Sequence, residues 1–126
     1  MEKKPLAYIV EDNRDTVTIF RGALELADYE VEVAYDGAVA QKYLTEFIPD
    51  LIVLDLHIPN VPGDIILQRI RSDERLKETR VFLATADANM AAQLRDQAEL
   101  GLLKPIGFSQ LKELAQRFRP DTGDTP

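Results

Sequence analysis

Cysteine is absent from this chain of 126 residues, and histidine occurs only once. Without cysteine, a disulfide framework and a thiolate metal site are both excluded, and the composition suits a reducing compartment. The single histidine, His57, excludes a cluster of histidine metal ligands, and the strand pattern supplies no partners for a Ser-His-Asp triad built on it. We read His57 as a solvent-facing residue, and the chemistry has to come from other side chains.

The chain also lacks an excess of positive charge and a long hydrophobic run. Its 22 acidic residues outnumber its 15 basic residues, and the resulting net charge of -7 disfavours binding to nucleic acid. The first apolar run covers only residues 6–10, which is far too short for a signal sequence or a membrane span. We therefore expect a cytoplasmic protein that binds neither nucleic acid nor membrane.

Short apolar runs predict the strands of an α/β domain. Residues 6–10, 51–54 and 81–84 are almost continuously apolar, as strands covered on both faces require. Residues 30–34 alternate between polar and apolar side chains, which predicts an edge strand, and residues 102–103 predict a short final strand. The runs are separated by helical patterns, and this alternation predicts a parallel sheet with helices on both faces.

Apolar side chains three and four residues apart predict the helices between these strands. The first extends from Arg14 to about Asp28, and others are expected around residues 39–47, 66–70, 89–100 and 108–118. The polar residues 71–80 predict a solvated loop whose mixed charges form a solvent-facing surface. We expect one domain over residues 1–119 and a disordered tail over residues 120–126, which are rich in proline, glycine, aspartate and threonine.

Reactive side chains stand at the ends of four of the five predicted strands. Glu11 and Asp12 follow the first, Asp55 follows the third, Thr85 closes the fourth and Lys104 follows the last. In a parallel sheet the carboxyl ends of the strands build the site, so these residues are expected to meet. Three carboxylates in one cleft repel one another, and an all-oxygen set favours a hard cation such as Mg²⁺.

Such a set can support phosphoryl transfer. Asp55 is the candidate nucleophile, Lys104 provides an ammonium group that stabilises charge on the transferred group, and Thr85 provides a hydroxyl that can hydrogen-bond it. Glu11 and Asp12 could instead serve a helix N-terminus, and the segment at Lys104 could be an ordinary turn. The joint occurrence of these residues favours the functional interpretation.

The chain resembles the receiver domain of two-component response regulators from residue 6 to residue 118. The motifs that support this resemblance are Val10-Glu11-Asp12-Asn13, residues 49–55 with Pro59 and Gly63, Ala84-Thr85-Ala86, and Lys104-Pro105. The resemblance implies a flavodoxin-like, doubly wound sheet of five parallel strands in the order 2-1-3-4-5, with five helices on both faces. It also implies a cis peptide bond between Lys104 and Pro105.

The resemblance further implies a function in phosphorelay signalling. Asp55 would accept a phosphoryl group from a histidine kinase or phosphotransfer protein, and Mg²⁺ would be held by Glu11, Asp12, Asp55 and the backbone carbonyl of His57. Lys104 and Thr85 would assist. We expect a stand-alone receiver that acts on a downstream protein effector and is compatible with a homodimer. It would not be an enzyme beyond slow self-phosphorylation and autodephosphorylation. His57 and Asp87 stand where the family modulates the access of water to the acyl phosphate.

The chain departs from the family pattern in two places. The family usually has Tyr or Phe three residues before the lysine, where this chain has Gly101, so the usual aromatic switch is absent. Thr85 and Lys104 are 19 residues apart (104 − 85), fewer than the family normally has, which predicts a shortened segment around the fourth helix. Output through that region and dimerisation therefore do not transfer directly from the family.

Two other functions remain open on the sequence. The first is a binding module of receiver shape that no longer depends on phosphorylation, which Gly101 and the shortened segment favour. The second is a phosphatase of the haloacid dehalogenase type, which also uses an aspartate nucleophile with Mg²⁺. Such enzymes need a second aspartate two residues after the nucleophile, where this chain has His57.

Overall fold

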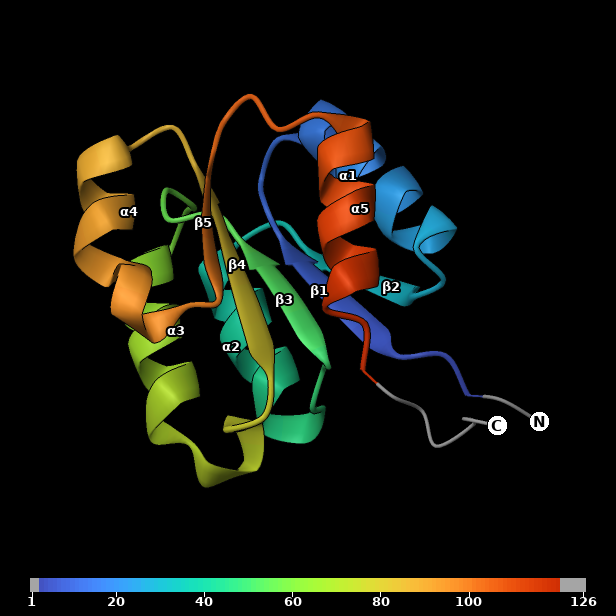
Figure 1. Cartoon of the computed structure of the whole chain (residues 1–126). Coiled ribbons are helices and arrows are strands. Elements are labelled where there is room, and N and C mark those ends of the chain that lie inside the picture. The colour runs from blue at the N-terminus through green and yellow to red at the C-terminus, as the bar shows by residue number, and fades with distance from the viewer. Residues whose placement is uncertain (1–2, 121–126) are drawn as a thin grey trace.

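Five parallel strands form the central sheet of the structure, a computed structural model in which residues 3–120 are described (Figure 1). The sheet has the order β2-β1-β3-β4-β5, which confirms the predicted topology. β1, β3 and β4 lie inside the sheet and β2 is an edge strand, in agreement with the alternating pattern of its sequence. The strands are β1 (Leu6–Val10), β2 (Glu30–Ala34), β3 (Leu51–Leu54), β4 (Arg80–Thr85) and β5 (Leu100–Leu103).

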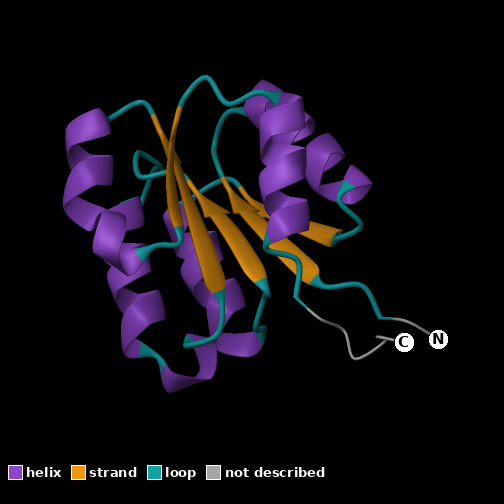
Figure 2. Ribbon diagram, in the orientation of Figure 1, coloured by secondary structure: helices purple, strands orange, loops and turns teal. Residues whose placement is uncertain are grey.

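Within residues 3–120, five α-helices cover the two faces of this sheet, as expected from the alternation of strands and helices (Figures 1 and 2). α1 and α5 pack on one face, and α2, α3 and α4 pack on the other. The helices are α1 (Arg14–Leu26), α2 (Gly37–Glu46), α3 (Gly63–Ser72), α4 (Ala88–Leu94) and α5 (Phe108–Arg117). The fold class is therefore the flavodoxin-like α/β fold that the sequence predicts.

Short polar side chains begin three of the helices at the carboxyl edge of the sheet. Asn13 accepts a hydrogen bond from the backbone of Thr16 at the start of α1, and Asp36 and Asp87 do the same for α2 and α4. A side-chain oxygen at this position satisfies an amide that has no partner inside the helix. Asn13 therefore has a structural role at the start of α1.

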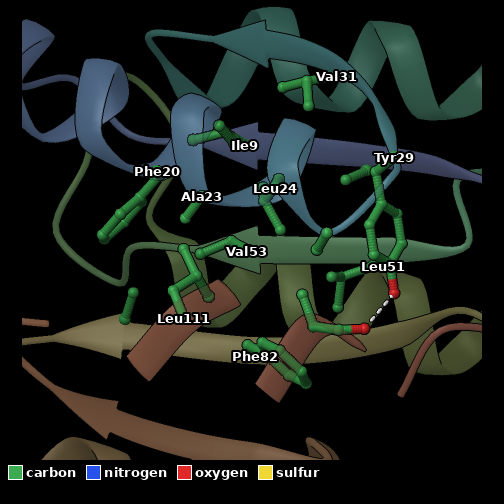
Figure 3. Close-up of a cluster of buried hydrophobic side chains, with 14 of the residues drawn as sticks. Ile9, Phe20, Ala23, Leu24, Tyr29, Val31, Leu51, Val53, Phe82 and Leu111 are labelled. Carbon is green, nitrogen blue, oxygen red and sulfur yellow. Dashed lines mark hydrogen bonds between the residues drawn. The ribbon is translucent and has the colours of Figure 1, made fainter. Parts of the chain in front are cut away.

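The core between the sheet and the α1–α5 layer is closed by a buried tyrosine (Figure 3). The hydroxyl of Tyr29 donates a hydrogen bond of 2.7 Å to the backbone carbonyl of Ala115, drawn as the dashed line in Figure 3. Ala115 lies in the last turn of α5, where carbonyl groups have no partner within the helix. Tyr29 therefore links the end of the last helix to the beginning of β2.

We expect Tyr29→Phe to lower the free energy of unfolding by about 1–2 kcal/mol, because it leaves a buried carbonyl without its donor. Chemical denaturation followed by circular dichroism measures this change. Tyr35→Phe is the matched control, since Tyr35 is on the surface. The free energy of unfolding of this variant should stay within about 0.5 kcal/mol of that of the unmodified protein. Equal unfolding midpoints for the two variants would contradict the assignment.

The prediction of a solvated loop over residues 71–80 is wrong in part. α3 continues to Ser72, and a 3-10 helix, η1 (Glu74–Leu76), follows it. Leu76 and Thr79 are buried, and the hydroxyl of Thr79 donates to the backbone carbonyl of Pro49 over 2.7 Å. Arg71 donates to the backbone carbonyl of Thr79 and forms an ion pair with Glu99. Polar composition concealed these contacts because polar side chains can also be held by partners inside the fold, such as the backbone of Pro49.

The fourth helix is shorter than the predicted range of residues 89–100. α4 ends at Leu94 and a 3-10 turn, η2 (Arg95–Gln97), follows it. Leu100 belongs to β5, where it lies opposite Phe82 of β4. α4 itself is a helix of seven residues.

Within residues 3–120, no helix combines the length and the apolar character needed to cross a membrane. The predicted C-terminal tail begins at Pro120, and its residues 121–126 lie outside the described residues.

Candidate functional site

The three predicted carboxylates meet at the carboxyl edge of the sheet. Glu11 directly follows β1, and Asp55 directly follows β3, where its backbone amide donates to the carbonyl of Val10 over 2.9 Å. Asp12 completes the cluster, and one oxygen atom from each of the three carboxylates lies within 4.8 Å of the others. Glu11 and Asp55 are almost fully buried, whereas Asp12 is exposed. The cleft therefore opens to solvent on the side of Asp12.

Lys104 places its ammonium group between two of these carboxylates. Its Nζ lies 2.6 Å from Oε1 of Glu11 and 3.2 Å from Oδ2 of Asp55. The backbone places it there, because the amide of Lys104 donates to the carbonyl of Thr85 over 2.9 Å. The following Lys104-Pro105 peptide bond is cis, as the resemblance implied. Residues that are 93 positions apart in the sequence, Glu11 and Lys104, thus form one ion pair.

The charges in the cleft are incompletely balanced. Burial raises the pKa of Glu11, while the hydrogen bonds from Lys104 and from the amide of Asn13 oppose this increase. Burial lowers the pKa of Lys104, but Glu11 and Asp55 outweigh that effect, so its pKa is raised overall. One ammonium group faces three carboxylates, and a further cation would stabilise their ionised forms.

The donor set of this cleft fits Mg²⁺. Every side-chain ligand is a carboxylate oxygen, which is the ligand type that this hard cation prefers. Mg²⁺ usually takes only one or two protein carboxylates and keeps several waters, and the exposed side of Asp12 leaves room for them. Glu11, Asp12 and Asp55 are therefore the residues that would hold the ion.

Thr85 closes β4 beside this cluster and is fully buried. Its Oγ1 accepts a hydrogen bond of 3.1 Å from the backbone amide of Asp87. A threonine hydroxyl has one proton and two lone pairs, so accepting this bond leaves its proton free to donate. The side chain can therefore offer a hydrogen bond to a group that enters the cleft.

The side chains of His57 and Asp87 lie within hydrogen-bonding distance of each other. His57 Nε2 lies 3.2 Å from Oδ2 of Asp87, and 61% of the histidine side chain is exposed, as expected for a solvent-facing residue. The backbone amide of His57 also donates to Oδ1 of Asp55 over 3.1 Å. The sequence reasoning did not pair the two side chains. Their positions carried the signal, since each stands two residues after the end-of-strand residue of neighbouring strands, Asp55 and Thr85.

Gly63 packs against the acceptor loop, which is the segment that follows β3 and begins with Asp55. A Cβ atom at this position would overlap the backbone oxygen of Asp55 and lie 2.6 Å from the Cα of Leu56. The amide of Gly63 donates to the carbonyl of Leu56 over 3.1 Å. The first residue of α3 thus packs directly against the backbone that carries Asp55, which only a residue without a side chain permits.

Gly101 leaves open space on β5, where the resemblance would place an aromatic ring. A Cβ atom there would meet only Ala91, at an ordinary distance of 3.8 Å. No side chain from β5 therefore fills the surface beside α4 at this position.

Comparison with known proteins agrees with this geometry. A family model described as the response regulator receiver domain matches residues 7–116. The polar-differentiation response regulator DivK of Brucella ovis is 30% identical over 116 residues, which cover 90% of this chain and 94% of that protein. The DNA-binding dual master transcriptional regulator RpaA of Synechocystis sp. is 38% identical over 82 residues, which cover 65% of this chain. These residues make up only 34% of RpaA, so the chain spans about a third of that relative's length.

Solved structures show the same similarity. The signal receiver domain of a putative LuxO repressor protein from Vibrio parahaemolyticus superposes with a TM-score of 0.83 and is 27% identical. The superposition covers 92% of this chain and 90% of that domain.

Proposed function

This chain belongs to the response regulator receiver domain family, and we propose from this premise that Asp55 accepts a phosphoryl group from a histidine kinase or phosphotransfer protein. The observation that carries the proposal is the ammonium group of Lys104 between Glu11 and Asp55, beside a carboxylate cluster suited to Mg²⁺. Receiver domains are signalling modules. The chemistry of the site would therefore switch the chain between an unphosphorylated and a phosphorylated state. Its only catalytic activity would be slow self-phosphorylation and autodephosphorylation.

Each side chain has a defined part in the proposed transfer. A carboxylate oxygen of Asp55 forms a bond to phosphorus while the nitrogen–phosphorus bond of the donor breaks, and the electron pair of that bond stays on the donor imidazole. Lys104 stabilises the negative charge on the transferred oxygens, since it is fixed within 3.2 Å of the acceptor before the reaction begins. Mg²⁺, held by Glu11, Asp12, Asp55 and the backbone carbonyl of His57, would supply further charge stabilisation.

The proposed signal starts at Thr85. The hydroxyl proton of Thr85 is free to donate to a phosphoryl oxygen, and its Oγ1 is also the acceptor for the amide of Asp87. A turn of Thr85 toward the phosphoryl group would weaken the contact with Asp87, the residue that caps α4. The phosphorylation state would in this way reach α4 without an aromatic ring at position 101.

Phosphorylation by a small phosphodonor tests the proposal. We expect acetyl phosphate with Mg²⁺ to add one phosphoryl group, detected by intact-protein mass spectrometry, and we expect chelation of the metal to prevent it. Asp55→Asn should remove the modification completely, because an amide is not a nucleophile of this kind. Asp15→Asn is the control, since Asp15 is exposed on the first turn of α1 and should change nothing. Labelling that persists in Asp55→Asn would contradict the role of Asp55.

The second candidate function is a receiver-shaped binding module that acts without phosphorylation. The open surface at Gly101 and the short α4 favour it. The region of α4 and β5 that would respond to phosphorylation lacks the aromatic side chain that the family usually has at position 101. Amide NMR spectra with and without beryllofluoride separate the two functions. Shifts that spread from Asp55 to α4 support the phosphorylation-dependent function, and a spectrum unchanged by Mg²⁺ and beryllofluoride supports the module. A cytoplasmic location and a protein effector are part of both proposals.

A further inference from the structure

A cleft of about 400 Å³ lies between the side chains of α2 and α3. These two helices lie on the opposite side of the sheet from α1 and α5 (Figure 1). Each wall is formed by side chains three and four residues apart on its helix. Its floor is apolar and consists of buried side chains that belong to the core of this face. The residues that define it are Gln41, Lys42 and Thr45 of α2, and Ile66, Arg69 and Ile70 of α3.

Three side chains of this cleft offer hydrogen-bond donors. Lys42 and Arg69 are exposed on opposite walls, and neither forms an ion pair with any residue in the described part of the chain. Asp73, the one carboxylate of the lining, is already held by the backbone amide and the guanidinium of Arg75. Within residues 3–120 the side-chain nitrogen of Gln41 is buried without a partner, so rotation toward an acceptor in the cleft would satisfy it.

We propose that this cleft binds an amphipathic helix of a partner protein, with apolar side chains on the floor and carboxylates beside Lys42 and Arg69. Both walls are ten-residue helices, so each wall is about 15 Å long. A groove of this kind accepts a helix through apolar side chains at positions i, i+3 and i+4. The two cations select an acidic helix over a basic one.

The two walls of the cleft are both anchored to the loop that follows the acceptor. Gly63, the first residue of α3, packs against the backbone of Asp55 and Leu56. Gly37, the first residue of α2, donates to the carbonyl of Pro59 over 2.9 Å and leaves no room for a Cβ beside the backbone of Val61. A movement of residues 55–62 therefore moves both walls. The inference therefore extends to a coupling that rests on the proposed function. Phosphorylation of Asp55 would change the affinity of the cleft for the helix, and binding of the helix would change the phosphorylation equilibrium by the same factor.

Two synthetic peptides of one design test the binding. Both form an amphipathic helix with leucine on one face. In the first peptide this face is flanked by glutamate, and in the second it is flanked by lysine. With a net charge of -7 the whole protein attracts the basic peptide, so a preference for the acidic peptide has to come from a local cationic site. We expect the acidic peptide to bind about tenfold more tightly, as two ion pairs at a partly desolvated surface would give. Amide NMR should locate its shifts on residues 38–45 and 66–73.

Charge reversal provides the matched control. Lys42→Glu with Arg69→Glu should invert the preference of the cleft, whereas Lys112→Glu with Arg117→Glu makes the same change in net charge on α5 and should keep the preference for the acidic peptide. Equal binding of both peptides, shifts outside α2 and α3, or no binding of either peptide would overturn the proposal. Self-association of the chain without peptide, abolished by Lys42→Glu, would also overturn it, because a second copy would then be the occupant.

The coupling is tested separately with beryllofluoride. We expect the affinity for the acidic peptide to change at least threefold on addition of Mg²⁺ and beryllofluoride, and the change to disappear in Asp55→Asn. Equal affinities in the two states would overturn the coupling. Labelling of Asp55 by acetyl phosphate is measured independently of the peptide, so failure of the cleft and failure of the phosphoryl-transfer site give different results.

Discussion

Replacement of Lys104 by methionine is expected to slow phosphorylation of Asp55 by about 10²–10³-fold, the loss typical for one fixed donor to a developing negative charge. The Nζ of Lys104 lies 3.2 Å from Oδ2 of Asp55, so the substitution removes the ammonium group closest to the acceptor. Methionine has a similar length and no charge, which keeps the packing of the stem. The rate is measured with acetyl phosphate and saturating Mg²⁺ by mass spectrometry of quenched samples.

The same variant should bind Mg²⁺ more tightly, because Lys104 is a competing cation within 2.6 Å of Glu11. Isothermal titration calorimetry measures this affinity, and the two effects have opposite signs. A variant that was merely misfolded would lose both phosphorylation and metal binding, so the combination identifies a charge effect. Lys112→Met on α5 is the control for loss of one lysine. A phosphorylation rate equal to that of the original chain would contradict the role given to Lys104.

The residues of the site could be predicted because the carboxyl ends of parallel strands share one edge of the sheet. Asp55 and Lys104 are 49 residues apart, yet each follows the end of a short apolar run, and the structure brings them within hydrogen-bonding distance. The positions of His57 and Asp87, two residues after Asp55 and Thr85, indicate only that they lie on neighbouring loops, and their contact could not be predicted in the same way. It depends on the conformation of two loops, which the apolar pattern does not record.

In the fold, too, the buried strands could be predicted from the sequence, whereas the connections between elements could not. The apolar runs at residues 6–10 and 51–54 coincide with β1 and β3, since a strand buried on both faces has no polar positions to obscure its limits. The limit between α4 and β5 was placed wrongly because Leu100 continues a helical spacing, while its position in the sheet depends on pairing with Phe82. Segment 71–80 was misjudged because its polar side chains bond to the backbone of other segments.

Gly63→Ala is expected to lower the free energy of unfolding by about 3 kcal/mol and to slow phosphorylation of Asp55. The added Cβ would overlap the backbone oxygen of Asp55 and approach the Cα of Leu56 to 2.6 Å. Backbone atoms cannot turn aside as a side chain does, so either α3 or the acceptor loop has to move, and such overpacking costs at the upper end of the usual range. A helix-favouring substitution by alanine, which gains about 0.5–1 kcal/mol elsewhere, would be outweighed here.

Gly101→Ala is the matched control for this substitution. A Cβ at Gly101 meets only Ala91 at 3.8 Å, so the same chemical change is expected to be neutral or to stabilise by about 0.4–1 kcal/mol through the unfolded chain. Urea denaturation measures both variants, and the acetyl phosphate reaction reports on the site. If Gly63→Ala were as stable and as reactive as Gly101→Ala, the packing of α3 against the acceptor loop would not position Asp55. The anchoring of α3, one wall of the cleft, to the backbone of Asp55 and Leu56 would lose its basis as well, because it depends on that same contact.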